Sequence, residues 1–170
     1  PVLEKICPMC ERASFDGKTH PGCQTRYSLD GLVSFFRYEG VVKNIIHRLK
    51  YRPWIADLVK VLTISVNKEQ FSGFIVVPVS LHPSRERSRG FNQASLIGQA
   101  IASQLTLEFK EGILKRVRHT KPQIELKGKE RRENIKDAFA FNPNILISQD
   151  PNILLIDDVW TTGSTLRACA

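Results

Sequence analysis

The sequence lacks the features that mark membrane, secreted and fibrous proteins. No stretch approaches the roughly 18 unbroken apolar residues of a membrane helix, and the longest apolar runs, such as 74–81, are the length of a strand. Residues 1–5 contain no basic segment followed by an apolar one, as a secretory signal would. With 42% hydrophobic and 25% charged residues, the 170-residue chain falls in the globular range. We therefore expect a soluble, cytoplasmic protein with no membrane insertion.

Cysteine is also scarce, and its distribution does not suggest a secreted disulfide framework. Three of the four cysteines lie within the first 23 residues. Cys7 and Cys10 form one pair, His20 and Cys23 form another, and each pair has the two-residue spacing typical of structural zinc. Four protein ligands leave no open coordination position, so this pattern predicts a structural metal site. The alternative is a set of free or disulfide-linked thiols in an irregular tail.

The distribution of apolar residues predicts the organisation of the chain. Residues 1–28 have too little apolar periodicity to form a core, so we expect a zinc-binding module there and a second domain over 29–170. In that domain, strand-like runs are expected at 31–38, 74–79 and 152–158, and helices at 41–52, 55–66, 96–105 and from 163 onward. Alternating strands and helices predict an α/β fold with a parallel sheet flanked by helices. Because Ala170 lies inside the last expected helix, we also expect the natural chain to continue beyond it.

Positive charge is concentrated in two segments. The formal net charge is +8, and residues 115–136 hold nine bases against three acids. Residues 85–89 hold three arginines and one glutamate, so the remainder of the chain is nearly neutral. Such concentration indicates a polyanionic partner, either a phosphate-bearing small molecule or nucleic acid. The alternative is a solvated loop and helix face.

Residues 153–165 contain the pattern that is most informative about chemistry. Asp157 and Asp158 follow an apolar run, and a turn rich in hydroxyl groups then leads into a helix; its members are Thr161, Thr162, Gly163, Ser164 and Thr165. Backbone amides of such a turn converge on an anion, and the helix dipole adds to the attraction. The two carboxylates need another partner, and ribose hydroxyls with Mg²⁺ nearby on a pyrophosphate meet that need. The alternative is an ordinary capped helix. The Gly-x₄-Gly-Lys pattern of nucleotide triphosphatases is absent.

Residues 153–165 resemble the phosphoribosyl-pyrophosphate loop of type I phosphoribosyltransferases. That loop has four hydrophobic residues, two acids and a Thr-Thr-Gly-Ser/Thr turn. The resemblance assigns the ribose 2- and 3-hydroxyls to Asp157 and Asp158 and the 5-phosphate to residues 161–165. It also implies a type I phosphoribosyltransferase-like fold, in which the segment after the 74–79 strand binds pyrophosphate, here through Arg85, Arg87 and Arg89.

Further strings across 7–165 are similar to the ComF family, the competence-associated phosphoribosyltransferase-like proteins. They lie at 38–40, 49–51, 77–79 and 89–94, and at the single positions 116, 120, 123, 126, 131, 132, 134 and 139. The family usually has cysteine where this chain has His20. This resemblance implies a role in the uptake of single-stranded DNA during natural transformation, and it makes 115–136 the mobile loop that covers the site.

Three functions remain open on this basis. The first is the transfer of ribose 5-phosphate from phosphoribosyl pyrophosphate, with Mg²⁺, to an acceptor; no residue identifies that acceptor or a general base. The second is binding of single-stranded DNA, with the phosphoribosyl site kept as a sensor or relic, through Lys127, Lys129, Arg131 and Arg132. The third is a zinc-stabilised adaptor for another competence protein. Trp160, inside the expected loop, either stacks on a ligand or packs locally.

Overall fold

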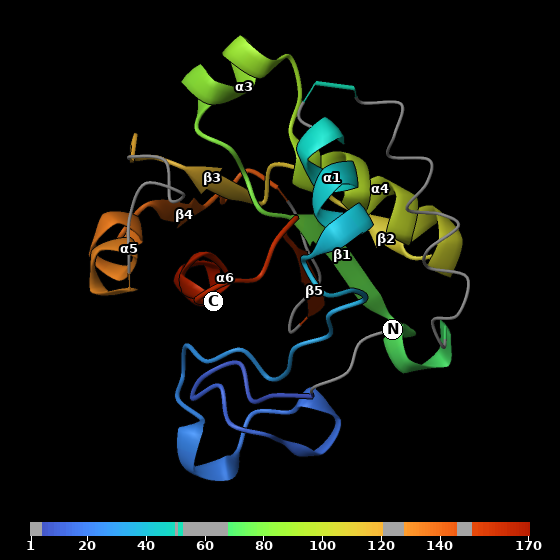
Figure 1. Cartoon of the computed structure of the whole chain (residues 1–170), viewed down its shortest axis with the longest axis vertical. Coiled ribbons are helices and arrows are strands. Elements are labelled where there is room, and N and C mark those ends of the chain that lie inside the picture. The colour runs from blue at the N-terminus through green and yellow to red at the C-terminus, as the bar shows by residue number, and fades with distance from the viewer. Residues whose placement is uncertain (1–4, 50, 53–67, 121–127, 146–150) are drawn as a thin grey trace.

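The central element of the described fold is a parallel three-stranded sheet. The computed structural model describes residues 5–49, 51–52, 68–120, 128–145 and 151–170 (Figure 1). Strand β1 (Phe74–Pro78) is the middle strand, with β2 (Glu108–Phe109) on one side and β5 (Asn152–Ile156) on the other. Both pairings are parallel, and the register sets Ile75 opposite Ile153 and Pro78 opposite Ile156. The expected α/β fold with a parallel sheet flanked by helices is confirmed.

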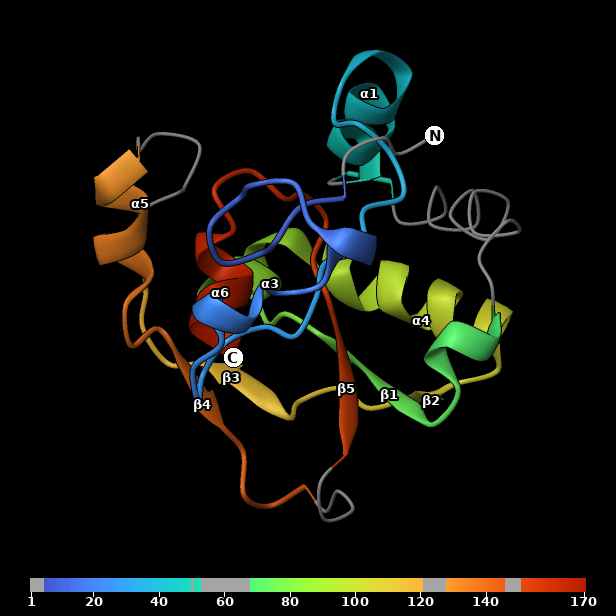
Figure 2. The ribbon, with the colours of Figure 1, turned by 90° about the horizontal axis from the view of Figure 1, so that it is seen from below.

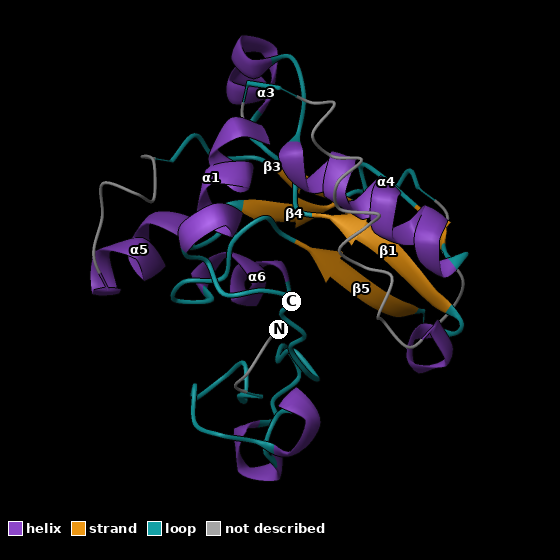
Figure 3. Ribbon diagram, turned by 45° about the vertical axis from the view of Figure 1, so that its right-hand side comes forward, coloured by secondary structure: helices purple, strands orange, loops and turns teal. Residues whose placement is uncertain are grey.

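Helix α4 (Gln93–Leu105) covers one face of the sheet and connects β1 to β2 (Figure 3). Its apolar residues pack with Val76 and Ile156 of the sheet in a core that also includes Leu49, the last residue of α1 (Gly40–Leu49). The Asn92 side chain begins α4 by accepting a hydrogen bond of 3.1 Å from the Ala94 amide. These helices match the expected helical periodicities at 41–52 and 96–105, whereas the helix expected at 55–66 lies outside the described residues.

The opposite face of the sheet packs against the C-terminal helix α6 (Ser164–Cys169). There the buried side chains of Ile75 and Val77 meet Ile113, Leu114 and Cys169. An antiparallel pair lies beside this core: β3 (Leu114–Arg116) pairs with β4 (Phe139–Phe141), and α5 (Gly128–Ile135) belongs to the segment that connects them. The segment 115–136, expected to be a loop, therefore includes a helix. This helix contacts α6, the C-terminal helix.

Two expectations about local structure are wrong. The segment after β1, expected to be a basic loop, contains helix α3 (Pro83–Arg89), because Pro83 opens it, His82 caps it and Gly90 ends it with φ of 87°. Residues 31–38, expected to be a strand, make a single isolated bridge, between Lys18 and Gly31. Their aromatic composition reflects partial burial instead, since Phe35 packs against the α4 core.

The N-terminal segment has little regular structure in its described part. It contains two 3₁₀ turns, η1 (Phe15–Gly17) and η2 (Pro21–Cys23). Another 3₁₀ turn, η4 (Lys68–Phe71), lies outside this segment and precedes β1. Gly17 is required where it stands, because its φ is +74° and a Cβ atom would lie 2.3 Å from the Leu32 carbonyl oxygen. In the described part of the chain, every helix is too short or too polar to span a bilayer.

Candidate metal centre and phosphate loop

The four residues expected to bind zinc come together in the structure. One potential ligand atom from each of Cys7, Cys10, His20 and Cys23 lies within 4.8 Å of every other. In a tetrahedral zinc site, bonds of about 2.0–2.3 Å put neighbouring ligand atoms about 3.5–4 Å apart, so the residues present fit zinc with little movement. The His20 Nδ1 atom is 3.4 Å from the Cys10 sulfur. Its Nε2 atom donates a 3.1 Å hydrogen bond to the Ala13 carbonyl oxygen, which leaves Nδ1 as the ligand.

Backbone amides around the cluster favour thiolates at two of the cysteines. Cys7 is fully buried, which raises its pKa, but hydrogen bonds from the amides of His20, Cys10 and Met9 outweigh burial and hold the pKa below its ordinary value. The pKa of Cys10 is lowered mainly by a hydrogen bond from the Arg12 amide. Such donors stabilise the deprotonated sulfur that binds a metal.

The third cysteine, Cys23, has a pKa shifted in the opposite direction. The pKa of Cys23 is raised, first by its hydrogen bond with Cys10 and next by burial. A divalent cation in the centre would reverse that effect, because it stabilises all three thiolates at once. The chemistry of the donor set therefore fits a resident Zn²⁺ held by all four side chains.

The second candidate site lies where β5 ends. Asp157 and Asp158 directly follow the strand, and both side chains are partly buried. The Asp158 amide donates a 2.9 Å hydrogen bond to Oδ1 of Asp157. Burial and the adjacent Asp158 charge raise the pKa of Asp157 to about 7, so this carboxyl group exchanges its proton near neutral pH. A pKa so far from the ordinary value marks Asp157 as a candidate functional group.

The turn that follows is compact and internally bonded. The hydroxyl groups of Thr162 and Ser164 are 2.7 Å apart, and Gly163 has φ of +64° immediately before α6. A Cβ atom on Gly163 would lie 2.3 Å from the Trp160 ring, so the indole lies directly against the glycine. Trp160 therefore packs against the turn, and stacking on a ligand stays a prediction.

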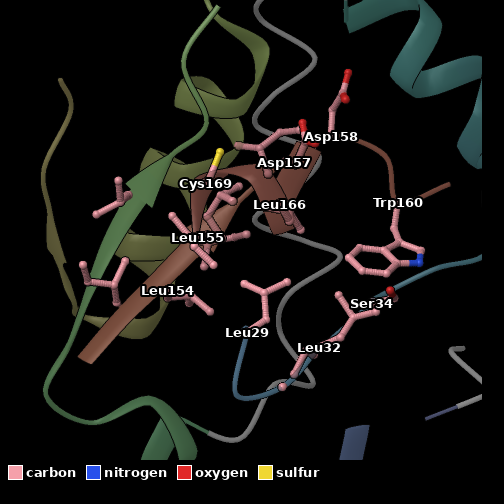
Figure 4. Close-up of a pocket in the computed structure, with 18 of the residues that line it drawn as sticks. Leu29, Leu32, Ser34, Leu154, Leu155, Asp157, Asp158, Trp160, Leu166 and Cys169 are labelled. Atoms are coloured by element: carbon pink, nitrogen blue, oxygen red, sulfur yellow. Dashed lines mark hydrogen bonds between the residues drawn. The ribbon is translucent and has the colours of Figure 1, made fainter. Parts of the chain in front are cut away.

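A large cleft opens beside this turn. It has a volume of about 1470 Å³, and Asp157, Asp158 and Trp160 lie along its wall. Figure 4 shows apolar side chains of the N-terminal segment and of β5 lining the same cleft, among them Leu29, Leu32, Leu154 and Leu155. The cleft is therefore polar where the two acids lie and apolar along β5.

The three arginines expected on the pyrophosphate side belong to α3 and its C-terminal end. Arg85 is partly buried and donates a hydrogen bond to the Thr120 carbonyl oxygen. Arg89 donates to the side-chain oxygen of Gln93, and Arg87 is exposed. Each of the three thus has a different environment, although their sequence context is nearly the same.

Arg116 lies near enough to Asp157 for their charges to interact, although the two residues are far apart in the sequence. Its side chain is buried, donates to the Thr120 hydroxyl at 2.5 Å and lies over the Phe139 ring at 5.4 Å. Burial and the neighbouring Arg85 charge lower its pKa, and the Asp157 charge acts in the opposite direction. Its Nε atom is buried without a hydrogen-bond partner among the described residues. Of the nine bases in 115–136, this one faces inward instead of contributing to a basic surface.

Two further groups have shifted pKa values: His82, which lies near Arg116, and Tyr38, which lies near Asp158. The ring of His82 lies 5.0 Å from that of His119, and burial together with the charges of His119 and Arg116 lowers the His82 pKa. Tyr38 has a raised pKa, mainly through burial and secondly through the Asp158 charge. The position of Tyr38 near the acids was not expected, because a single aromatic residue carries no spacing signal.

The residues expected to bind nucleic acid are placed only in part. Lys129, Arg131 and Arg132 belong to α5, and Lys127 lies outside the described residues. At the two ends of the same connection, Lys115, Arg118 and Lys136 are exposed. Arg118 donates to the Lys136 carbonyl oxygen, which ties the two ends together.

Comparisons with known proteins give a consistent picture. Competence protein F of Haemophilus influenzae is 30% identical, with 95% of this chain and 81% of that protein aligned. DNA utilization protein YhgH of Salmonella typhimurium is 33% identical, over 97% of this chain and 76% of that protein. Competence protein ComFC of Bacillus subtilis is 29% identical, over 99% and 71% respectively. No family model matches the chain, and no solved structure does.

Fold and site together define an α/β protein in which an N-terminal Cys₃His cluster precedes a strand that ends in two acids. The relatives named above, which align along nearly the whole chain, specify the family. The chain belongs to the ComF family, as its sequence resemblance indicated.

Proposed function

We propose that this protein binds phosphoribosyl pyrophosphate together with Mg²⁺ at the carboxyl end of β5. The observation that carries the proposal is the adjacent pair Asp157 and Asp158 at the strand end, followed by the bonded turn at 161–165 and the N-terminus of α6. The acids would accept hydrogen bonds from the ribose hydroxyls, and the turn would donate to the 5-phosphate. Mg²⁺ would supply charge neutralisation on the pyrophosphate oxygens.

The cationic side chains near the acids support an anionic leaving group on that side. The buried Arg116 guanidinium has an Nε–H group with no hydrogen-bond partner among the described residues, and the Arg85 charge lies close enough to lower the Arg116 pKa. Guanidinium groups bind phosphate oxygens through paired donors, so these two arginines would hold the pyrophosphate in place. If transfer occurs, the chain's contribution is orientation and stabilisation of charge as the bond at ribose C1 breaks.

Calorimetry with phosphoribosyl pyrophosphate and Mg²⁺ tests the proposal. Asp158→Asn should weaken binding about tenfold or more, because the loss of a charge-assisted hydrogen bond costs about 1.5–3 kcal/mol. Asp137→Asn is the matched control: Asp137 is exposed, and its φ of 51° is one that asparagine tolerates. Unchanged affinity in Asp158→Asn, or no binding by the parent, would refute the assignment. Pyrophosphate release with candidate acceptors then separates a transferase from a sensor.

A second function concerns DNA. The relatives are named for competence and for DNA utilization, and we propose a corresponding role in DNA uptake for this chain. Exposed Lys115, Arg118 and Lys136, together with the basic residues of α5, support a contact with single-stranded DNA that is distinct from the phosphoribosyl site. Fluorescently labelled oligonucleotide and phosphoribosyl pyrophosphate should then bind at the same time. Full displacement of the oligonucleotide by phosphoribosyl pyrophosphate would instead indicate one shared site.

A further inference from the structure

Arg167 of α6 connects the two candidate sites. Its Nε atom donates a 2.5 Å hydrogen bond to the Pro8 carbonyl oxygen, and Nη2 pairs with the Glu11 carboxylate at 2.9 Å. Its Nη1 atom donates a 3.0 Å hydrogen bond to the Thr162 carbonyl oxygen. The guanidinium carbon also lies 5.5 Å from the centre of the Trp160 ring. All three nitrogen atoms of one side chain are therefore used, and the partners come from opposite ends of the chain.

On the metal side, the partners of Arg167 belong to the turn that carries two ligands. Pro8 lies between Cys7 and Cys10, and Glu11 directly follows Cys10. Two backbone hydrogen bonds close this turn: the Cys7 amide donates to the Arg12 carbonyl oxygen and the Glu11 amide to the Cys7 carbonyl oxygen, both at 2.9 Å. Metal binding fixes such a turn because bonds to one ion join Cys7 and Cys10, and metal loss removes that restraint. The metal thus sets the positions of the Pro8 and Glu11 oxygens.

On the loop side, the partners of Arg167 belong to the candidate phosphate-binding turn. The Thr162 carbonyl group precedes Gly163, whose positive φ reverses the chain into α6. The Trp160 ring packs against this glycine and also contacts the Arg167 guanidinium, so the guanidinium supports the indole that packs against the turn. In Figure 2 the N-terminal segment passes across α6, and the hydrogen bond from Arg167 to Pro8 joins the two.

The side chain is held firmly enough to transmit a displacement. Arg167 is 17% exposed and Glu11 is 49% exposed, so the pair is only partly screened by water. A guanidinium that donates to three partners cannot keep good geometry with all of them if one group moves, since its donor directions are fixed. When the turn at Cys7–Cys10 moves, Arg167 must lose its contacts on either the metal side or the loop side.

We propose that Arg167 is a positioning residue that couples occupancy of the Cys₃His cluster to the conformation of residues 160–163. Metal binding holds Pro8 and Glu11, these hold the guanidinium, and the guanidinium holds Thr162 and Trp160. The consequence for phosphoribosyl pyrophosphate rests on the proposed function above. Coupling of this kind is reciprocal, so a ligand that stabilises the loop must also slow loss of the metal.

Trp160 fluorescence tests the coupling without any phosphoribosyl ligand. The chain has two tryptophans, so a Trp54→Phe background leaves Trp160 as the reporter. Stripping zinc with a chelator should shift Trp160 emission in the full chain. Arg167→Met should have nearly the stripped spectrum while zinc-loaded and should change little on stripping. Arg26→Met, which removes an exposed arginine near the same cluster, should behave like the parent.

A second readout separates coupling from simple stabilisation. In the parent, saturating phosphoribosyl pyrophosphate and Mg²⁺ should slow zinc transfer to a chromogenic chelator about fivefold or more, and Arg167→Met should remove this effect. Arg167→Lys, which keeps the charge but not the three-way geometry, should not restore it. Glu11→Gln, which leaves Arg167 in place and weakens only the metal side, should reduce the effect if Arg167→Met does not fold.

The outcomes are distinguishable. A protein that binds no zinc, or Arg167→Met and Glu11→Gln variants whose Trp160 spectra respond to zinc like the parent, would overturn the coupling. A parent that fails to bind phosphoribosyl pyrophosphate, but whose Trp160 responds to zinc through Arg167, would refute the proposed function and leave the coupling supported.

Discussion

At Asp157, the fold holds a carboxyl group where its charge is poorly stabilised. Its pKa is raised to about 7, first by burial and next by the Asp158 charge, and Arg116 offsets these effects only in part. The unfolded chain has no such environment, and an ordinary aspartate has a pKa near 3.8. The folded state therefore binds this proton more tightly than the unfolded state does. Asp157 contributes stability that is full below pH 4 and is lost as the pH rises through 7.

Asp157→Asn should remove this dependence on pH. We expect the free energy of unfolding of the parent to fall by a few kcal/mol between about pH 4 and pH 8 relative to that of the variant. The variant should be more stable than the parent at pH 8, because asparagine has no charge to bury. Urea unfolding at several pH values measures the effect, with Asp137→Asn as the exposed control. Parallel pH profiles for the parent and Asp157→Asn would contradict the prediction.

Gly163 allows a second prediction at the scale of one residue. Alanine there would adopt φ of +64°, at a cost of about 1 kcal/mol or more, and its Cβ would displace the Trp160 ring. We expect Gly163→Ala to lower thermal stability and to weaken binding of phosphoribosyl pyrophosphate about tenfold or more, because the turn at 161–165 would move. Gly22→Ala is the control, since nothing lies within 4 Å of its Cβ position. Calorimetry that shows equal affinity for the two variants would count against this role of the turn.

Sequence patterns identified the candidate site residues that lie within a few positions of one another in the sequence. The four candidate metal ligands and the Asp-Asp pair lie in compact motifs, and the structure brings the four candidate ligands together as expected. Tyr38, Arg116 and Arg167 carry no such signal. Their roles depend on partners that lie far along the chain, such as Pro8 for Arg167, and only the folded arrangement of β5, α6 and the N-terminal turn makes these contacts.

At the scale of elements, Asn92 shows how one residue can connect a strand to a helix. Its side-chain oxygen caps α4 at Ala94, and its amide nitrogen donates a 3.0 Å hydrogen bond to the Val79 carbonyl oxygen, just after β1. The side chain is buried, so both hydrogen bonds are protected from water. The residue belongs to the family-like string at 89–94, and its described contacts give it a structural role.

Asn92→Ala should therefore destabilise the fold substantially. Loss of the cap costs about 1 kcal/mol and the unpaired Val79 carbonyl about 1–3 kcal/mol more, so we expect a total of about 2–4 kcal/mol. Asn92→Ser keeps a capping oxygen but cannot also donate to Val79, so it should lose only the second contribution. Chemical denaturation of the three proteins checks this order. Equal stability of the serine and alanine variants would show that the cap contributes nothing.

Elements were predictable where periodicity and length agreed, as for β1, β5 and α4. Helix α3 was not expected because its composition is charged and its seven residues are too few to show an apolar stripe; its cap residues, His82 and Gly90, were the available signal. The 31–38 segment was mistaken for a strand because Phe35 and its neighbours are apolar for packing, without a partner strand. Local composition cannot distinguish these two causes of burial.

At the scale of the whole molecule, the metal should stabilise the N-terminal module and leave the central sheet intact. We expect about one zinc per chain, and loss of that zinc in Cys10→Ser. The sheet and α4 have a core of their own, so circular dichroism should retain most of its helical signal. The matched control is Cys169→Ser, since this thiol lies away from the cluster in the core beside α6. Zinc retained in the double variant Cys7→Ser/Cys10→Ser would refute the assignment of the ligands.

The last prediction concerns how the charge of the whole chain is used. The number of bases in 115–136 exceeds what one pyrophosphate can bind, even without the buried Arg116. The bases that are exposed in the structure lie at both ends of the segment that connects β3 to β4 through α5. Contacts to phosphates release counterions, so affinity for single-stranded DNA should fall with salt at a log–log slope of about −0.7 per phosphate neutralised.

Arg131→Ala/Arg132→Ala should flatten that slope by about one to two units if both residues contact phosphates, with little change in sequence preference, because phosphate contacts carry no base information. Lys43→Ala/Arg48→Ala removes the same charge from exposed positions on α1 and serves as the control. Glu133→Gln, which removes an exposed acid from α5, should act in the opposite direction and tighten binding. Fluorescence anisotropy across a salt series measures all four proteins. If affinity is independent of salt, the bases of α5 do not contact DNA phosphates, and α5 is a solvated part of the segment that covers the site. If the α5 and α1 variants lose affinity equally, the charge acts through the net field of the chain and not through a contact at α5.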